Sequence, residues 1–143
     1  MKDKIDKYIG KQTCATICCV DEQGWPYCFN CFFSYDSSKS LLFYKSSPDT
    51  QHQLCLSKNP SVAGTILPDR LNLLQVKGVQ FTGIVLPVNH PLAENASVDY
   101  YKKHPVALAI KGEIWVIQIN SIKFTDNSLG FGKKLIWDRP AAL

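Results

Sequence analysis

The residues best suited to chemistry gather in positions 41–67, where an apolar strand-like run, a short helix and a second apolar run follow one another. The turn before the helix carries Lys45 and Ser46, followed by the triplet Thr50-Gln51-His52. Such side chains beside a helix N-terminus are typical of a phosphate site, because free backbone N–H groups and the helix dipole both favour an anion there. An ordinary capped junction between a strand and a helix is the alternative interpretation.

The boundaries of this helix follow from its capping residues. Ser47 is a good N-cap and Pro48 suits the first helical position, so the pattern predicts a helix that starts directly after Ser47. The helix is expected to end at Asn59-Pro60, because a residue that precedes proline disfavours helical backbone.

Six cysteines form the second group that could do chemistry: Cys14, Cys18, Cys19, Cys28, Cys31 and Cys55. No signal peptide is recognisable, so free thiols that serve as small hydrophobic side chains are expected rather than disulfides. The spacing Cys28-x-x-Cys31 is that of half a zinc site, but an odd separation in a strand sends the two side chains to opposite faces. A cross-strand metal site with Cys14 and Cys18, and a redox-active cysteine, stay open as alternatives.

Classical catalytic arrangements are not found in the sequence. It has no Gly-x-Ser-x-Gly motif, no P-loop and no His-x-x-x-His pair. His52, His90 and His104 are far apart, and the last two precede prolines at expected helix boundaries, where an exposed structural role is expected. These absences favour a site whose chemistry is supplied by a cofactor.

The composition is ordinary for a soluble globular protein, with 45% hydrophobic residues, 20% charged residues and a net charge of +4. At 143 residues, the chain is expected to form a single domain, 1–143. Its positive charges are scattered, which disfavours nucleic acid as a partner and suits an anionic small molecule. No apolar run approaches the roughly 20 residues of a membrane span, so we expect a cytoplasmic protein with no membrane partner.

Alternation of apolar and polar residues predicts a chain built mainly of strands. We expect strands over residues 13–20, 27–35, 41–45, 62–67, 76–86, 113–119 and 122–125 and at the end of 126–137, with helices over 2–10, after 47 and over 91–104. Both faces of 113–119 are partly apolar, as in a strand of a closed sheet. The predicted fold is mainly β (α+β), a six- to seven-stranded antiparallel β-barrel with about three short helices.

The order of these elements resembles the FMN-binding split barrel of the pyridoxamine 5'-phosphate oxidase-like superfamily. Three local patterns carry this resemblance: Phe43-Tyr44-Lys45, Thr50-Gln51-His52 and Asn59-Pro60-x-Val62-Ala63. Within the superfamily, the chain is most similar to the uncharacterised YhbP-like family, through residues 62–65, 78–83 and above all 122–137. The resemblance extends over nearly the whole chain.

The resemblance implies a homodimer with two FMN sites at the subunit interface and a role as an FMN-dependent oxidoreductase of unknown substrate. The backbone of the second strand would lie along the flavin ring at Asn30, Cys31 and Phe32. The phosphate would be held by Tyr44, Lys45, Thr50, Gln51 and His52. Gln80 would face the same cleft, and the partner subunit would contribute Lys134 and Trp137.

The sequence also departs from the oxidase pattern at the expected cofactor site. Asn30 stands where the oxidase has an arginine, and Thr50-Gln51-His52 replaces its Ser-Arg-Lys triplet. An FMN phosphate carries close to two negative charges, which Lys45 and His52 would have to balance. Binding should then loosen as pH rises and His52 loses its proton. A non-catalytic module that binds flavin, haem or another anionic ligand on the same barrel is the alternative function, since some split-barrel relatives handle haem.

Overall fold

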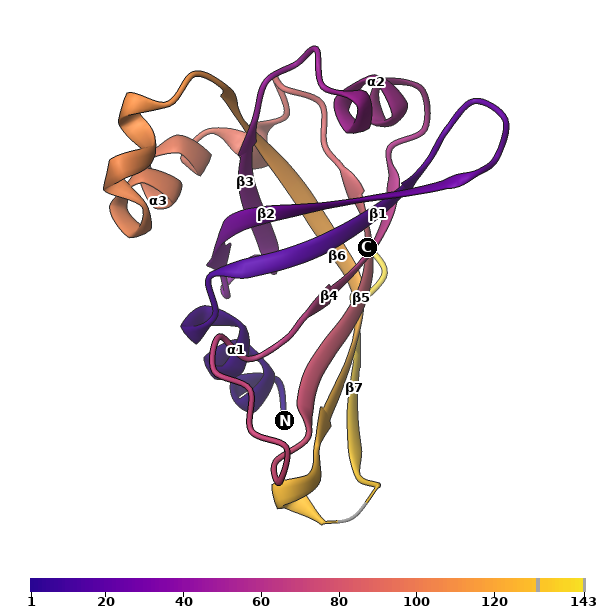
Figure 1. Cartoon of the computed structure of the whole chain (residues 1–143), viewed down its shortest axis with the longest axis vertical. Coiled ribbons are helices and arrows are strands. Elements are labelled where there is room, and N and C mark those ends of the chain that lie inside the picture. Colours follow the sequence, from indigo (N-terminus) through magenta and orange to yellow (C-terminus); the bar gives the residue numbers. More distant parts are fainter. Residues whose placement is uncertain (131, 143) are drawn as a thin grey trace.

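The computed structural model describes residues 1–130 and 132–142, and within them seven antiparallel strands form one sheet (Figure 1). The strand order is β3-β2-β1-β4-β5-β6-β7, and pairing of β3 with β6 closes six of these strands into a barrel. The strands are β1 (Cys14–Val20), β2 (Pro26–Asp36), β3 (Leu41–Ser46), β4 (Ser61–Ile66), β5 (Lys77–Val85), β6 (Glu113–Asp126) and β7 (Lys134–Asp138). This architecture confirms the predicted mainly β barrel.

The described helices cover the barrel on different sides. They are α1 (Lys2–Lys11), α2 (Gln51–Lys58) and α3 (Ala96–Lys103). α1 and α2 lie near opposite ends of the barrel, whereas α3 packs against the outside of β2, β3 and β6 (Figure 1). The predicted helix over residues 91–104 is broken into a 3-10 turn (Pro91–Ala93) and α3, because Asn95 departs from helical backbone angles. None of the described helices has the length and apolar character needed to cross a bilayer.

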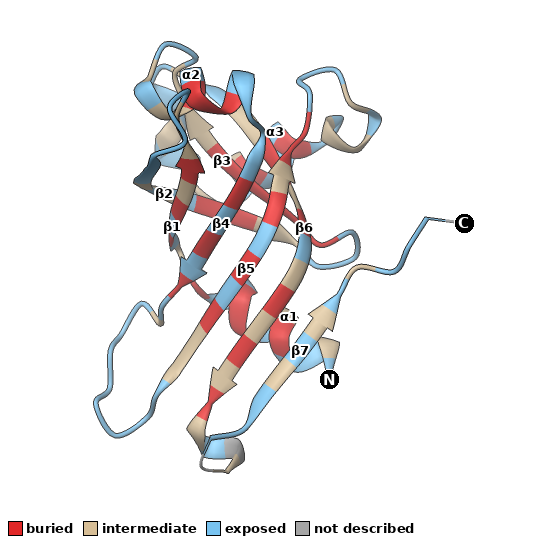
Figure 2. Ribbon diagram, turned by 90° about the vertical axis from the view of Figure 1, so that its right-hand side faces the viewer, coloured by how far each residue is buried: buried red, intermediate tan, exposed pale blue. Residues whose placement is uncertain are grey.

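Strand alternation separates a barrel interior from an outward face. On β4, Val62, Gly64 and Ile66 are buried, whereas Ala63 and Thr65 between them are exposed (Figure 2). The inward-facing buried positions of the barrel strands meet in one core, to which the apolar stripe of α1 is added from one end and that of α2 from the other. On the outward face, the side chains of Thr16, Asn30, Thr65 and Gln80 on β1, β2, β4 and β5 are exposed, so they are available to a ligand or a partner.

β3 differs from the other strands because both of its faces are buried. Leu42 and Tyr44 point into the barrel core, whereas Leu41 and Phe43 pack on the outside with Tyr100 of α3. This explains why the run at the start of β3 is continuously apolar rather than alternating. As in any strand, the side chains of consecutive residues at the end of β3 point to opposite sides of the sheet.

β6 is one long strand that unites the two predicted segments 113–119 and 122–125. Its first part pairs with β3 and its last part with β7. β3 and β7 therefore lie one after the other along the same side of β6. The β5–β6 register shifts between Thr82 and Gly83, and a Cβ at Gly83 would lie 2.4 Å from the carbonyl oxygen of Gln118. Glycine is therefore required at this bulge. Phe131, which belongs to the segment 122–137 that carries the YhbP-like resemblance, lies outside the described residues.

The expected start of the second helix is wrong by three residues. Ser47 does not cap α2; instead, the backbone N–H of Thr50 donates to the Ser47 carbonyl at 3.3 Å and closes a turn. Thr50 is the N-cap, and its hydroxyl accepts from the backbone N–H of Gln53 at 3.3 Å. The error has a physical cause, because the fixed φ of Pro48 suits the second position of a β-turn as well as the first position of a helix.

Candidate functional site

Three polar side chains meet where β3 ends and α2 begins. The hydroxyl oxygen of Ser46 lies 2.7 Å from Nε2 of His52 and 3.2 Å from the hydroxyl oxygen of Thr50. The His52 ring stacks on Phe29 of β2, with ring centroids 3.7 Å apart and planes within 9°. We call Ser46, Thr50 and His52 the hydroxyl–imidazole cluster. The cluster connects the N-terminus of α2 with β2.

The cluster is polar but carries little charge at neutral pH. Burial lowers the pKa of His52 from its ordinary value of 6.5, so the imidazole is neutral at pH 7. A neutral imidazole has one donor and one acceptor nitrogen, and Ser46 is placed to bond with Nε2 in either role. The cluster can therefore hold an anion through neutral donors, helped by the dipole of α2.

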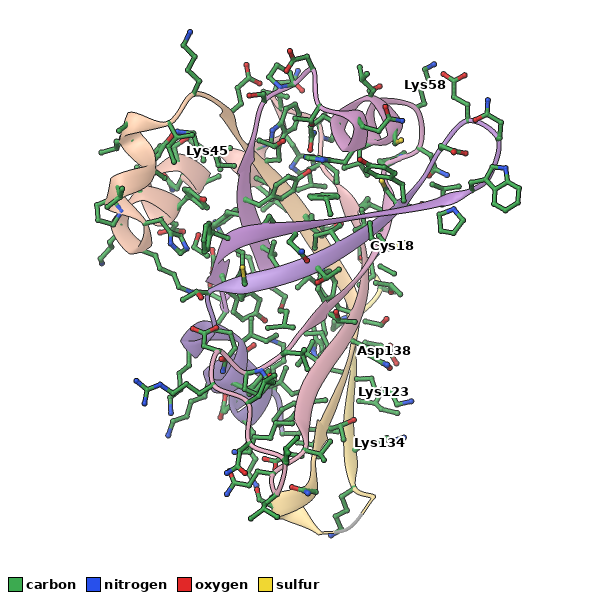
Figure 3. All side chains as sticks on the ribbon, in the orientation of Figure 1. Cys18, Lys45, Lys58, Lys123, Lys134 and Asp138 are labelled. Atoms are coloured by element: carbon green, nitrogen blue, oxygen red, sulfur yellow. The ribbon has the colours of Figure 1, made fainter. Side chains whose placement is uncertain are left out.

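Lys45 and Gln51 are not brought into this cluster. The ammonium group of Lys45 donates to the backbone carbonyl of Ala107 at 2.6 Å and lies 4.8 Å from the ring centroid of Tyr101. Figure 3 shows Lys45 on the α3 side of the barrel, away from α2. Gln51 is the first residue of α2 and its side chain is exposed. Since Lys45 and Ser46 are neighbours in a strand, their separation follows from alternation.

Tyr44 and Cys31 lie inside the barrel. Tyr44 is fully buried, and its hydroxyl donates to Oε1 of buried Gln53 at 2.5 Å, so it supports α2 from beneath. Burial raises the pKa of this phenol. Cys31 is packed against the same core, and burial raises the pKa of its thiol to about 12. Both groups are therefore neutral and packed at pH 7.

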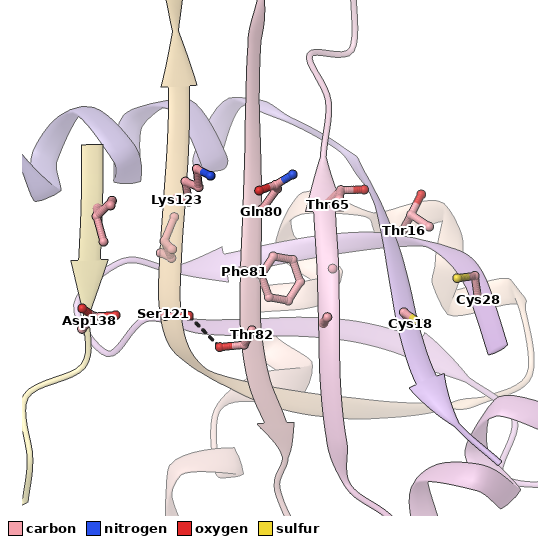
Figure 4. Close-up of a pocket in the computed structure, with 14 residues that line it drawn as sticks. Thr16, Cys18, Cys28, Thr65, Gln80, Phe81, Thr82, Ser121, Lys123 and Asp138 are labelled. Atoms are coloured by element: carbon pink, nitrogen blue, oxygen red, sulfur yellow. Dashed lines mark hydrogen bonds between the residues drawn. The ribbon is translucent and has the colours of Figure 1, made fainter. Parts of the chain in front are cut away.

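A row of polar side chains crosses the outward face of five neighbouring strands. From β2 to β6 the row consists of Asn30, Thr16, Thr65, Gln80 and Lys123, each directly opposite the next in the sheet register. The Thr16 hydroxyl donates to Oδ1 of Asn30 at 2.7 Å. Figure 4 shows four members of the row side by side. The sheet thus brings the predicted site residues Asn30 and Gln80 to the same face.

A shallow hollow of about 540 Å³ lies over this face. Gly64 and Phe81 are part of its lining, and Ile136 and Asp138 of β7 line its far side. Sequence reasoning singled out Gln80 but missed Thr16 and Thr65. The exposed alternation on β1 and β4 was the signal that could have identified them.

Phe32 and His104 form a further contact on the outward side of β2. Phe32 is 61% exposed, and its ring centroid lies 5.9 Å from that of His104. Nε2 of His104 lies 2.7 Å from the carbonyl oxygen of Phe33. A carbonyl only accepts, so Nε2 carries a proton and donates this bond. His104 was expected to be an exposed structural residue, yet it is half-buried against β2.

The two residues expected from a partner subunit lie away from the hydroxyl–imidazole cluster in the single chain. Lys134 is exposed at the start of β7, far from α2 (Figure 3). The Trp137 ring lies 4.8 Å from the ammonium group of Lys2 and 5.6 Å from the guanidinium carbon of Arg139. Trp137 also packs on the barrel core.

No group of three or more metal-ligating side chains is found in the described part of the chain. Cys28 is exposed on the outward face, whereas Cys31 packs against the core. The predicted placement of these two cysteines on opposite faces is therefore confirmed.

Comparison with known sequences identifies the family. The chain is 35% identical over 136 residues to the UPF0306 protein plu4501 of Photorhabdus laumondii, and the match covers 94% of each chain. It is 34% identical over 135 residues to the UPF0306 protein YhbP of Escherichia coli, covering 94% of this chain and 91% of that one. The chain belongs to the UPF0306 (YhbP) family. No protein-family model matches it.

Solved structures with the same fold bind different cofactors according to their names. A haem-binding protein from Mycobacterium smegmatis superposes with a TM-score of 0.80 at 12% identity, covering 96% of this UPF0306 chain and 57% of that one. An FAD-binding protein from Mesorhizobium loti gives 0.67 at 16% identity, covering 86% and 92%. The haem storage protein HutZ from Vibrio cholerae gives 0.62 at 15% identity, covering 82% and 87%. These similarities establish the split-barrel fold.

Proposed function

We propose that this UPF0306 protein binds FMN and serves as an FMN-dependent oxidoreductase. The hydroxyl–imidazole cluster is the observation on which the proposal rests. Ser46 and Thr50 would hold the phosphate together with His52, at the N-terminus of α2. The backbone of β2 at residues 30–32, directly after Phe29, whose ring stacks on His52, would lie along the flavin ring.

The residues present fit a phosphate in their hydrogen-bonding chemistry. The Thr50 hydroxyl and the His52 imidazole lie within 3.2 Å of the Ser46 hydroxyl, and the backbone N–H groups of Gln51 and His52 at the start of α2 lack intrahelical partners, whereas that of Gln53 is capped by Thr50. The fit in charge is weaker, since His52 is neutral at pH 7 and the Lys45 ammonium is bound to Ala107. Protonation of His52 would add a charge only below its ordinary pKa of 6.5, so pH-dependent tightening is expected there.

A second copy of the chain would complete the cofactor site. In this homodimer, β7 of one protomer would bring Lys134 to the phosphate bound by the other, and the exposed charge of Lys134 would balance it. Trp137 lies three residues further along the same strand, an odd separation that directs its side chain to the opposite face, where it packs on its own barrel core, so the proposed contact is assigned to Lys134. When bound, FMN supplies hydride or electron transfer, while the protein positions the ring and keeps one face open to a small substrate.

Titration with FMN and with riboflavin tests whether the hydroxyl–imidazole cluster binds the phosphate. FMN should show a shifted visible spectrum and quenched fluorescence when the protein is added. Ser46→Ala should weaken FMN about tenfold, because one hydrogen bond to a charged group is lost, and should leave riboflavin unchanged. Ser57→Ala is the matched control, since Ser57 is exposed in the last turn of α2.

Two results would contradict the proposal. One is the absence of any flavin signal at saturating FMN. The other is an equal loss of FMN and riboflavin affinity in Ser46→Ala, which would show that the cluster does not bind the phosphate. Size-exclusion chromatography with light scattering tests the homodimer, and a strictly monomeric holoprotein would exclude the role given to Lys134.

Haem is the second candidate ligand, and His104 favours it. A histidine that ligates a metal usually donates its other ring N–H to a carbonyl or carboxylate. His104 makes this bond through Nε2 to Phe33, and the exposed ring of Phe32 lies beside it. Haem titration of the wild type and of His104→Ala tests this alternative. A Soret band that requires His104, in a protein that gives no flavin signal, would show that the ligand is haem rather than FMN.

A further inference from the structure

Two cysteines face each other across the first hairpin. Cys18 of β1 and Cys28 of β2 are directly opposed in the sheet register. Both side chains are on the outward face, where Cys28 is exposed and Cys18 half-buried. They line the end of the hollow that is farthest from β7 in strand order (Figure 4). Burial and the neighbouring Cys28 thiol raise the pKa of Cys18.

The ladder between β1 and β2 places this pair where a disulfide can form. The backbone N–H of Phe33 donates to the carbonyl of Thr13 at 3.0 Å, in the same register. Hydrogen-bonded and non-hydrogen-bonded pairs alternate along an antiparallel ladder, so Cys18 and Cys28, five positions further, form a non-hydrogen-bonded pair. Pro26, which has no N–H to donate, occupies another such position. Opposed Cα atoms are about 4.5 Å apart there, within the range of about 4.4–6.8 Å for disulfides.

The remaining described cysteines do not share this arrangement. Cys14 is opposite Phe32 on the outward face, whereas Cys31 points to the core. Cys19 and Cys55 are both buried in the core. The chain therefore has one exposed pair of opposed thiols among its described residues.

We propose that Cys18 and Cys28 form a reversible dithiol–disulfide site that reacts with low-molecular-weight disulfides. The thiolate of exposed Cys28 attacks one sulfur of the small disulfide, forms a mixed disulfide and releases one small thiol. The thiolate of Cys18 then attacks the Cys28 sulfur and releases the second small thiol. The protein loses two electrons and two protons, and the small disulfide gains both to become two thiols. This site does not depend on the proposed cofactor.

Oxidised glutathione is the probe for this site. The chain is incubated with it, remaining thiols are alkylated, and the protein is cleaved with trypsin and a glutamyl endopeptidase. Cleavage after Lys11, Glu22 and Lys39 separates residues 12–22 from 23–39. A link between Cys18 and Cys28 then holds these peptides together. The count of free thiols should fall by two from six, and dithiothreitol should restore it. The thermal midpoint should rise on oxidation, because the link constrains the unfolded chain.

Single variants assign the link. Cys18→Ser and Cys28→Ser should each abolish the cross-linked peptide, whereas Cys14→Ser and Cys31→Ser should retain it. Three outcomes would overturn the proposal: persistence of the link in Cys28→Ser, full alkylation of both thiols after oxidation, or a covalent dimer on a non-reducing gel. The last outcome would place the disulfide between two copies.

Discussion

The contact between Gly64 and Phe81 supports a quantitative prediction for the sheet beneath the hollow. The two residues are opposed on β4 and β5, and the Phe81 ring, only 3% exposed, lies across the glycine. A Cβ at position 64 would be 2.3 Å from Cζ and 2.6 Å from Cε1 of this ring. Ordinary contact begins at 3.4 Å, so the ring in Gly64→Ala would have to withdraw by about 1.1 Å, the difference between 3.4 and 2.3 Å.

The barrel interior leaves little room for this movement. Overpacking of a core typically lowers the free energy of unfolding by about 1–3 kcal/mol, and two clashing ring atoms place Gly64→Ala near about 2–3 kcal/mol. Phe81→Ala alone should lower it by about 3–5 kcal/mol through the cavity that it leaves. In the double variant the new methyl group enters that cavity, so the effect of Gly64→Ala should vanish. The expected coupling energy is therefore about 2–3 kcal/mol.

Urea unfolding of the four proteins in this cycle, followed by tryptophan fluorescence, measures the coupling. Gly10→Ala is the matched control, because nothing lies within 4 Å of a Cβ at Gly10 and its helical site should gain about 0.5–1 kcal/mol. A Gly64→Ala protein as stable as the wild type would refute the steric reasoning. Additive losses in the double variant would refute the assignment of the clash to Phe81.

Two further predictions concern the residues around α2. Tyr44→Phe leaves Oε1 of buried Gln53 without a donor and should lower the free energy of unfolding by about 1–2 kcal/mol in urea, whereas Tyr27→Phe at an exposed site should change nothing measurable. His52 has a lower pKa in the folded state than its ordinary 6.5, so the unfolded state binds more protons as pH falls below 6.5 and the free energy of unfolding should decrease there. Urea midpoints at several pH values should show that His52→Gln removes this part of the pH dependence of stability. An unchanged pH dependence in His52→Gln would exclude His52 as its source.

The barrel could be predicted from the sequence because its signals are local. Alternation along β1, β2 and β4 identified the strands, and the two-sided apolar pattern of residues 113–119 correctly indicated a closed sheet. The start of α2 was mispredicted because Ser47 and Pro48 satisfy a turn as well as a helix cap. Two hydrogen bonds in the folded chain distinguish the alternatives: the Thr50 N–H donates to the Ser47 carbonyl, and the Gln53 N–H donates to the Thr50 hydroxyl.

The candidate site was predictable only in part. Asn30 and Gln80 lie in one row on the outward face because the register across β1 and β4 aligns them, and neither this register nor the strand order is visible in one sequence. His104 was missed for the same reason, since its contact with Phe33 joins residues 71 positions apart. The separation of Lys45 from Ser46 could have been foreseen, because consecutive strand residues always point to opposite sides.

The burial of both faces of β3 determines which charged side chains lie near the N-terminus of α2. Because α3 covers the outward side of β3, Lys45 is drawn to Ala107 and Tyr101 and stabilises the segment after α3. Ser46 is left on the side of α2, where it binds neutral His52. A dianionic phosphate in this place would be held by neutral donors and a helix dipole from its own protomer. In the proposed homodimer, the balancing positive charge would come from Lys134 of the other protomer, because the Lys45 ammonium is bound to Ala107. Under this proposal, FMN affinity would depend on dimerisation.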